Sequence, residues 1–478
     1  MKKHRKEILI SVIIPCYGTE ETLERCLKSV LSQETEETEI ILEEKGYETV
    51  DFDQKADLYV VNTCTVTNIA DRKSRQMLHR AKKLNPDAAV IAVGCYVETG
   101  RDMVLADPAI DLAIGNNKKV QIADILDRYL RSREESPDSG AGADKLLGGD
   151  TVEDLTVSPQ YENMQLENPG HTRAYIKIQD GCNQFCSYCI IPFARGRIRS
   201  RRPEEILREI RSLSGRGIRE VVLTGIHVSS YGLEWDVEGP VRFDPEKAGR
   251  ALYDLLARIQ EVPGIERIRL SSLEPRIMTE EFVKKIASLS KLCPHFHLSL
   301  QSGCDATLKR MNRHYSTREY LENVKRIRRY MDRPAVTTDV IVGFPGETEE
   351  EFAATRAFLE EVDFYEIHVF KYSVRKGTIA AKMKGQIPES VKGERSDIFL
   401  ALTQEQAGRF REGFYGREEE ILLEEKILSG GRAYWSGHTM RYVRCLIPAE
   451  EGHAPGELCR VKVLGPMEGT DAVLARPL

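Results

Sequence analysis

The stretch Gly181-Cys-Asn-Gln-Phe-Cys-Ser-Tyr-Cys189 decides the class of this chain. It follows an apolar, strand-like run at residues 173–179, and its cysteines Cys182, Cys186 and Cys189 have the spacing CxxxCxxC. Three thiolates on one short loop can hold three irons of a cubane iron–sulfur cluster, which leaves the fourth iron without a protein ligand. Clusters that only carry electrons usually have four cysteine ligands. The spacing therefore predicts a cluster whose open iron binds S-adenosylmethionine through its amino and carboxylate groups.

A structural zinc site is the alternative interpretation of these cysteines. Structural zinc takes four ligands, typically a CxxC pair with a second pair downstream. No second CxxC or HxxxH pair follows the loop in the sequence, and the next cysteine is Cys293. The spacing therefore favours the cluster over zinc.

Length and composition indicate a soluble protein of several domains. The chain has 478 residues, 41% hydrophobic and 30% charged, with a net charge of −6, which excludes a uniformly basic nucleic-acid binder. Its eleven cysteines occur in motifs rather than as scattered pairs, which indicates a reducing compartment. No stretch approaches the ~20 apolar residues of a membrane span. We read the apolar run at residues 8–14 as a buried strand, because no cleavage site follows it. These features predict a cytoplasmic protein that does not bind membranes.

Two local basic runs stand out against this acidic background. One is Arg72-Lys-Ser-Arg75 together with His79-Arg-Ala-Lys-Lys83, and the other is Arg195-Gly-Arg-Ile-Arg-Ser-Arg-Arg202. Such runs are commonly solvated helix faces. The second begins six residues after the cysteine loop, so we expect it to contact a polyanion close to the chemistry.

The order of predicted elements gives an α/β multidomain fold. Apolar runs at residues 8–14, 58–62, 88–93 and 110–114 alternate with helical patterns, which predicts a parallel α/β domain over residues 1–130. Residues 131–167 are rich in Ser, Gly, Asp and Glu and form a predicted linker.

Six further strand-like runs, separated by helical patterns, fill residues 168–405. They lie at residues 173–179, 220–224, 267–270, 296–300, 336–342 and 366–370. Repeated β/α units of this kind predict a partial TIM-type barrel, (β/α)6, with its chemistry at the C-terminal strand ends. The remaining residues, 406–478, show short strands and glycine turns at 418–426, 442–447 and 458–464, which predicts a small β-barrel suited to binding.

Three runs together resemble the radical S-adenosylmethionine methylthiotransferases, and within them the tRNA N6-threonylcarbamoyladenosine methylthiotransferases. The runs are Asn62-Thr-Cys-Thr-Val-Thr-Asn68 with Asp71-Arg-Lys-Ser-Arg-Gln76, Gly181 to Gly196, and His368-Val-Phe-Lys-Tyr-Ser-Val-Arg-Lys-Gly-Thr378. The resemblance covers residues from about 35 to 478. It implies an N-terminal cluster domain, a central radical S-adenosylmethionine barrel and a C-terminal TRAM domain.

The resemblance also implies the reaction and its participants. Reductive cleavage of S-adenosylmethionine gives a 5′-deoxyadenosyl radical, which removes a hydrogen from carbon 2 of the modified adenine beside the anticodon, at position 37 of the tRNA. Sulfur comes from a second, auxiliary 4Fe-4S cluster and methyl from a second S-adenosylmethionine. The expected partners are tRNA and an external electron donor of the flavodoxin or ferredoxin type. The oligomeric state is not predicted.

Four barrel residues are candidate contacts for S-adenosylmethionine. By position, Gly225 lets the cofactor approach the second strand, Glu274 and Gln301 offer polar contacts, and Gly343 opens the family's adenine-side loop, Gly343-Phe-Pro-Gly-Glu347. Nearby Ser271, Ser272 and Asp339 are equally read as helix caps or turn residues.

The resemblance implies an auxiliary cluster held by three cysteines, and the family motif that carries the first of them is absent here. Cys64 and Cys95 match the second and third ligands. The opening, Ile10-Ser-Val-Ile-Ile-Pro-Cys-Tyr-Gly18, instead resembles the start of a family-two glycosyltransferase over its first ~33 residues. Cys16 closes a strand but lies far upstream, whereas Cys26 has nearly the family distance but sits on a helical apolar stripe. We favour Cys16, because cluster ligands need a loop to converge on; an artefactual opening is the third alternative.

Three other functions remain as rivals. A methylthiotransferase could act on another tRNA adenosine or on a ribosomal protein. A glycosyltransferase is suggested by the opening alone, which is weak support. A pure RNA-binding protein would rely on the C-terminal barrel and hold iron dispensably.

Overall fold

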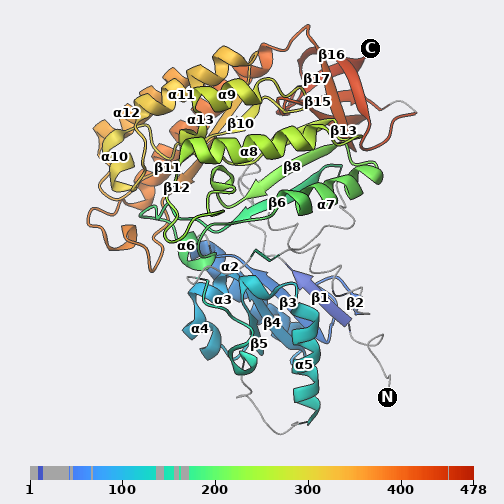
Figure 1. Cartoon of the computed structure of the whole chain (residues 1–478), viewed down its shortest axis with the longest axis vertical. Coiled ribbons are helices and arrows are strands. Elements are labelled where there is room, and N and C mark those ends of the chain that lie inside the picture. Colours follow the sequence, from blue (N-terminus) through green and yellow to red (C-terminus); the bar gives the residue numbers. More distant parts are fainter. Residues whose placement is uncertain are drawn as a thin grey trace. The chain divides into compact units, whose positions relative to one another are not determined.

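The computed structural model describes residues 9–13, 42, 47–65, 68–135, 145–155, 161–162, 172–449 and 452–478. The chain divides into two compact units. The first contains residues 1–167, 180–201 and 373–382, and the second contains residues 168–179, 202–372 and 383–478. Figure 1 labels their helices and strands. None of the described helices is both long and apolar enough to cross a membrane.

A five-stranded parallel sheet forms the core of the first unit. Its strand order is β2-β1-β3-β4-β5, and all its strand pairs are parallel. Strands β3 and β4 are buried along their whole length, which explains their continuous apolar sequences. The elements of this unit are β1 (Leu9–Ile13), β2 (Glu48–Thr49), β3 (Leu58–Thr63), α2 (Asn68–Leu84), β4 (Ala89–Gly94), α3 (Cys95–Thr99), α4 (Arg101–Ala106), β5 (Leu112–Ile114), α5 (Ile122–Glu135), α6 (Ile191–Ala194) and β7 (Arg199–Ser200). The parallel sheet predicted from the sequence is confirmed.

Part of the predicted linker belongs to this first unit. The backbone N–H of Ala113 donates to Lys145, and that of Gly115 donates to Thr151, at 2.9 and 2.8 Å between nitrogen and oxygen. Residues 145–155 therefore run along β5, although their composition predicts a linker. The predicted boundary at 130/131 falls inside α5, and the one at 405/406 falls inside α13.

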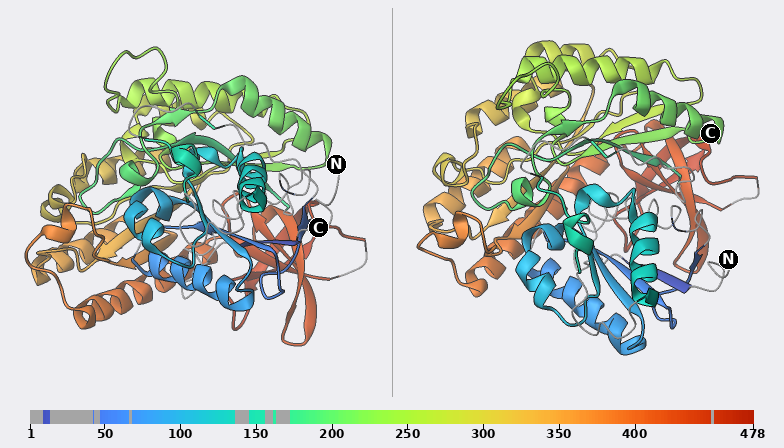
Figure 2. Two further views of the ribbon diagram at one scale, coloured as in Figure 1. Left: turned by 90° about the horizontal axis from the view of Figure 1, so that it is seen from below. Right: turned by 60° about the horizontal axis from the view of Figure 1, so that its bottom comes forward.

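The second unit begins with six parallel strands in the order β6-β8-β9-β10-β11-β12. These strands form two hydrogen-bonded sheets, one ending at β9 and one beginning at β10, and single bridges connect them, such as the one between Leu273 after β9 and Leu298 after β10. Helices α8, α9, α11 and α12 lie on the outer side of these strands (Figure 2). The elements are β6 (Ala174–Asp180), α7 (Pro203–Gly215), β8 (Glu220–Gly225), α8 (Pro245–Gln260), β9 (Arg267–Leu270), α9 (Glu280–Ile286), β10 (His295–His297), α10 (Asp305–Arg310), α11 (Thr317–Tyr330), β11 (Ala335–Val342), α12 (Glu349–Val362), β12 (Glu366–Lys371) and α13 (Glu389–Glu412). This confirms the predicted partial barrel.

Strand β10 is shorter than predicted, for a local reason. Side chains bond the carbonyls that would extend its ladder: the Tyr320 hydroxyl donates to Leu298, and the Tyr315 hydroxyl donates to Ser299 and Leu300. The strand-like sequence up to residue 300 therefore continues as an irregular buried segment.

A closed five-stranded barrel completes the second unit. Its strand order is β13-β14-β15-β17-β16, with β13 (Glu418–Ser429), β14 (Arg432–Thr439), β15 (Arg444–Pro448), β16 (Leu458–Pro466) and β17 (Val473–Pro477). Closure removes exposed strand edges. The predicted small β-barrel is confirmed; β14 and β17 are strands that the sequence patterns did not reveal.

Candidate iron–sulfur and cofactor sites

The loop after β6 presents Cys182, Cys186 and Cys189, all half-buried. Gly181 opens it with φ = +71°, and a Cβ at this position would lie 1.8 Å from the backbone oxygen of Arg197. Only glycine fits there, because the chain crosses itself so closely. Backbone bonds from Cys182 to Gly196 (3.1 Å) and from Cys189 to Cys186 (3.0 Å) fix the turn. The three thiols therefore share one short, tightly folded loop.

This donor set fits a cubane cluster with one open iron. Thiolates are the usual protein ligands of such clusters, and backbone N–H groups that bond to their sulfurs tune the bound cluster. The N–H of Gln184 lies 3.5 Å from the Cys182 sulfur, within this kind of contact. Partial exposure also leaves the loop accessible to a small molecule.

The arginine run after this loop does not form the exposed phosphate-binding stripe that the sequence predicts. Arg195, Arg199 and Arg201 are buried. Asp180 attracts two of them: its Oδ2 lies 3.0 Å from Arg199 and 3.6 Å from Arg195. A buried carboxylate at the end of β6 requires such partners, so these arginines support the loop. The expectation that this run contacts a polyanion is therefore wrong for its buried members.

Cys64 and Cys95 stand side by side at one edge of the first unit's sheet. Each directly follows its strand, and the last residues of those strands, Thr63 and Gly94, are register partners. Both cysteines are buried, each about 4% exposed. Two thiols in this arrangement could ligate one cluster. Cys16 and Cys26 lie outside the described residues.

Asn116 is a contact of this site that the sequence analysis missed. Its amide nitrogen lies 3.4 Å from the Cys95 sulfur and donates to the carbonyl of Ala194 at 2.8 Å. Ala194 lies five residues after Cys189, so one side chain links the neighbourhoods of the two cysteine sets. The sequence did contain a sign of this contact. Asn116 follows β5, and the C-terminal end of β5 lies at the same end of the parallel sheet as Cys95.

Glu98 lies one helical turn after Cys95 and accepts a bond from the backbone of Asn116 at 2.7 Å. Burial raises the pKa of Glu98 to about 7, despite that bond and the positive charges of Arg195 and Arg199. A carboxyl group beside the cysteines is therefore close to half-protonated at neutral pH.

Arg375 anchors residues 373–382 within the first unit and was also missed. It is buried, forms an ion pair with Asp71, and donates to the hydroxyl of Thr65. Asp71 and Thr65 lie in the family-like run near Cys64, and Arg375 lies in the third such run. Arg375 therefore joins the family-like run at residues 62–76 to the one at residues 368–378.

The four candidate cofactor residues lie at or after the C-terminal ends of strands in the second unit: Gly225 is the last residue of β8, and Glu274, Gln301 and Gly343 follow β9, β10 and β11. A Cβ on Gly225 would lie 2.9 Å from the Gln179 oxygen, and one on Gly343 (φ = +70°) would lie 2.3 Å from the Lys392 side chain. Gln301 is buried with φ = +72°, which is strained for a non-glycine residue. Such strain occurs most often at functional sites.

Glu274 is already tightly held by cations. It is buried and accepts bonds from Arg276 (2.7 Å) and Arg313 (3.1 Å), and His227 lies 3.6 Å away. Burial alone would raise the pKa of Glu274, but these cations hold it well below its usual range. It is therefore an ionised acceptor at neutral pH.

Asp339 does not cap a helix or a turn. It lies within β11, and its Oδ2 is 3.1 Å from the Nε2 of His297. Reading it as a cap is therefore wrong. In a barrel, every second side chain along a strand points toward the centre.

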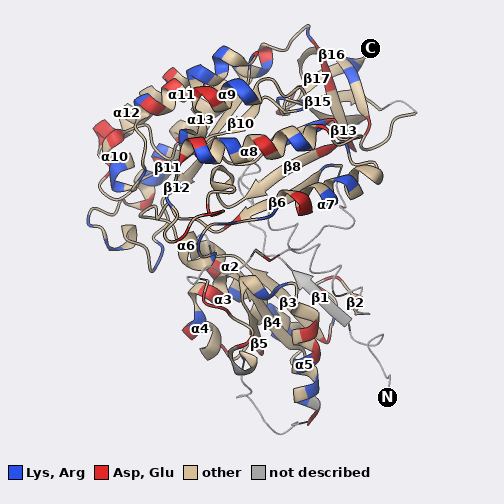
Figure 3. Ribbon diagram, viewed as in Figure 1, with Lys and Arg blue, Asp and Glu red and all other residues tan. Residues whose placement is uncertain are grey.

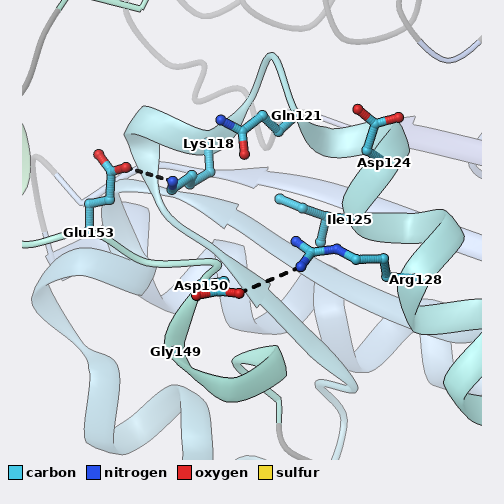
Figure 4. A pocket seen from close by; sticks show the side chains of 8 residues that line it. All are labelled: Lys118, Gln121, Asp124, Ile125, Arg128, Gly149, Asp150 and Glu153. Carbon is cyan, nitrogen blue, oxygen red and sulfur yellow. Dashed lines mark ion pairs between the residues drawn. The ribbon is translucent and has the colours of Figure 1, made fainter.

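The first unit also carries an open polar hollow, which is shown in Figure 4. Its cations already have carboxylate partners, Lys118 with Glu153 and Arg128 with Asp150. None of the candidate cysteines that the structure describes lines it. We therefore assign it no part in the cluster chemistry.

Sequence comparisons define the class of protein. Residues 176–359 match the Radical SAM superfamily, and residues 26–115 match the "Uncharacterized protein family UPF0004". The solved radical S-adenosylmethionine methyltransferase TsrM from Kitasatospora setae, with cobalamin and a 4Fe-4S cluster bound, aligns over 76% of this chain and 74% of its own, with a TM-score of 0.53 and 16% identity, which supports the fold. The fold and the cysteine loop thus define a radical S-adenosylmethionine enzyme, with a 4Fe-4S cluster and S-adenosylmethionine as its cofactors.

Curated relatives narrow the class further. The chain is 37% identical to the threonylcarbamoyladenosine tRNA methylthiotransferase MtaB of Bacillus subtilis over 90% of both chains, and 40% identical to MtaB of Aquifex aeolicus over 80% and 87%. It is 34% identical to the tRNA-2-methylthio-N(6)-dimethylallyladenosine synthase of Clostridium botulinum over 82% and 83%. The chain belongs to the tRNA methylthiotransferase family.

Proposed function

We propose that this enzyme methylthiolates carbon 2 of N6-threonylcarbamoyladenosine at position 37 of tRNA. The observation that carries the proposal is Asn116, which contacts both Cys95 and Ala194 and so brings an auxiliary cysteine pair close to the segment after the radical loop. Sulfur insertion requires a sulfur source near the radical chemistry. The specific nucleoside is suggested by the relatives named MtaB.

The chain's own residues have distinct roles in this proposal. Cys182, Cys186 and Cys189 hold the cluster, which, when bound, supplies the electron that cleaves S-adenosylmethionine. Gly225, Gln301, Gly343 and the ionised Glu274 bind and orient S-adenosylmethionine at the strand ends. The three-domain division and an electron donor of the flavodoxin or ferredoxin type stay predictions. We also propose that the enzyme is cytoplasmic, because the proposed substrate is tRNA.

We further propose Cys16 as the third auxiliary ligand, on the strength of strand register. Ile13 of β1 is the partner of Val61 in β3, and Val61 is the partner of Ala92 in β4. Ile13, Val61 and Ala92 thus form one row of register partners across the sheet. A cysteine comes three residues after each of them in the sequence, namely Cys16, Cys64 and Cys95. Parallel strands end at a common edge of a sheet, which is where loop ligands converge. Cys26 has no such relation to the row.

Replacing Cys16 by alanine should remove the auxiliary cluster and spare the radical cluster. We expect iron in reconstituted protein to fall by about four atoms per chain, because an auxiliary site with two cysteines holds a cubane poorly. Cleavage of S-adenosylmethionine to 5′-deoxyadenosine should continue, while thiolation is lost.

Cys26→Ala is the matched control and should retain all its iron. Full iron retention in Cys16→Ala would overturn the assignment, and loss of iron in Cys26→Ala instead would transfer it to Cys26.

A tRNA surface is proposed on helix α2. Arg72, Arg80 and Lys83 are exposed on one face of this helix, and Arg80 also forms an exposed ion pair with Asp53. In contrast, Lys and Arg are interleaved with Asp and Glu along α8, α9, α11 and α12 (Figure 3). Several cations on one face suit a phosphate backbone.

Mass spectrometry of tRNA nucleosides tests the proposed substrate. The chain would be expressed in a bacterial strain that makes N6-threonylcarbamoyladenosine but lacks its own methylthiolating enzyme. We expect the 2-methylthio derivative to appear. If only 2-methylthio-N6-dimethylallyladenosine rises in a second strain that lacks that activity, the enzyme acts on the other adenosine. A modified ribosomal protein peptide with unchanged tRNA would contradict both.

A further inference from the structure

Three side chains that the proposed function does not use converge inside the second unit's six-stranded barrel. They are His297 on β10, Asp339 on β11 and His368 on β12, and one ligand atom from each lies within 4.8 Å of the other two. Strand register places them: Asp339 and His368 are direct partners, and His297 is the partner of Thr337, two residues before Asp339. Three adjacent strands thus contribute one side chain each.

The three side chains lie on the inner face of the strands. Thr338, the neighbour of Asp339, is bonded by the hydroxyl of Tyr320 on the outer helix α11. Successive strand residues point to opposite faces, so Asp339 points away from the helices. Its partner His368 lies on the same face, and the stacked ring of His297 lies beside it.

The spacing of His297 and Asp339 agrees with ligation of a single ion, and the ligand atom of His368 lies within 4.8 Å of both. The His297 Nε2 and the Asp339 Oδ2 are 3.1 Å apart, and the two imidazole centres are 5.4 Å apart at 21°. Ligand atoms bound at about 2.1 Å in tetrahedral or octahedral geometry lie roughly 3.0–3.4 Å from one another. Two imidazoles on one ion then have their centres roughly 5 Å apart.

The hydrogen bonds are also those of a metal site. His297 Nδ1 lies 3.0 Å from the Thr337 hydroxyl, which fixes the ring and directs Nε2 toward Asp339. The side chain of His368 makes no hydrogen bond to any described residue.

We propose that His297, Asp339 and His368 bind one divalent first-row transition-metal ion. Two imidazoles and a carboxylate suit Fe²⁺, Mn²⁺, Co²⁺ or Zn²⁺, and three protein ligands leave positions open for water or an oxygen donor. This site is separate in sequence and in ligand type from the two cysteine sets. Its existence does not depend on which nucleoside the enzyme modifies.

Titration of the full-length, cluster-loaded enzyme with Mn²⁺ tests the site. Electron paramagnetic resonance measures free Mn²⁺ directly, and the oxidised 4Fe-4S clusters give no signal. We expect one Mn²⁺ to bind per chain, and His368→Gln and Asp339→Asn each to weaken binding at least tenfold. Thr337→Val should weaken it as well, because an outer partner of a ligating histidine typically contributes 10–100-fold in affinity.

His314→Gln is the matched control, because His314 is exposed and lies apart from the three residues in sequence. It should bind Mn²⁺ as the parent enzyme does. Cluster iron and circular dichroism of each variant show whether it is folded; His368→Gln removes no hydrogen bond to a described residue, so it should fold. Absence of Mn²⁺ binding, or equal affinity in the parent, His368→Gln and Asp339→Asn proteins, would mean that the three residues form only a hydrogen-bonded cluster and would overturn the proposal.

Discussion

Cys182→Ala is expected to abolish cleavage of S-adenosylmethionine and to lower cluster iron by about four atoms per chain. Cys182 is the first of three ligands on one loop, and its N–H bond to Gly196 helps to form the turn that gathers them. Apart from Cys186 and Cys189, which are already ligands, residues 181–201 contain no cysteine that could replace Cys182. A cluster with two protein ligands is lost or displaced, and the open iron is lost with it. The measurements are iron content and 5′-deoxyadenosine formation in the presence of dithionite.

Cys304→Ala provides the control for this loss. Cys304 is half-buried before α10 and is not a predicted ligand, so iron and cleavage should match those of the parent. Normal 5′-deoxyadenosine formation by Cys182→Ala would contradict the assignment of the loop.

Glu220→Gln is expected to lower the free energy of unfolding of the second unit by about 3–5 kcal/mol, the usual effect of removing one partner from a buried ion pair. Glu220 is fully buried, and its Oε1 lies 3.0 Å from both Arg173 and Arg269. Arg267 is 3.9 Å from its other oxygen. The variant leaves three buried guanidinium groups around a neutral amide. Denaturant unfolding followed by the fluorescence of the chain's two tryptophans, Trp235 and Trp435, which both lie in the second unit, measures the change.

The pH dependence identifies the cause of this destabilisation. Burial alone would raise the pKa of Glu220, but the three arginines lower it to about 2. Since the folded-state pKa lies below the unfolded value of about 4.3, the stabilisation is complete above pH 4.3 and is lost as the pH falls toward 2. The difference between parent and Glu220→Gln should shrink over that range.

Glu204→Gln is the control, because Glu204 forms an exposed ion pair with Arg258. It should change stability little at any pH. A constant difference between parent and Glu220→Gln from pH 5 to pH 2 would show that packing, and not charge, causes the effect.

Elements with a strong local pattern could be predicted from the sequence. The parallel strands β3 and β4 are buried on both faces and therefore have continuous apolar sequences. The cysteine loop was predictable because its three ligands are close together in sequence. Strand β14 was missed, because Arg432-Ala-Tyr-Trp-Ser-Gly-His-Thr439 alternates weakly and is stabilised by pairing with β13 and β15.

Contacts between distant parts of the chain could not be predicted. Arg375 and Asp71 are 304 residues apart, and nothing near either residue indicates the other. The arginine run looked exposed because its sequence is highly charged, whereas Asp180, fifteen residues before Arg195, keeps Arg199 inside. His297, Asp339 and His368 come together only through the register of three strands. Sequence spacing was therefore enough to predict the cysteine loop, whose ligands are local. It could not predict contacts that depend on how distant strands and segments pair in the fold.

The arginines around Glu220 also constrain how this enzyme can be altered. Arg173 forms an ion pair with Glu424, Arg267 donates to the backbone of Glu420 and His438, and Arg269 donates to Met440, all in the C-terminal β-barrel. A chimera with a foreign barrel, or a truncation before the barrel, would leave these arginines without their partners. The six-stranded barrel and the C-terminal β-barrel should therefore be exchanged or redesigned together.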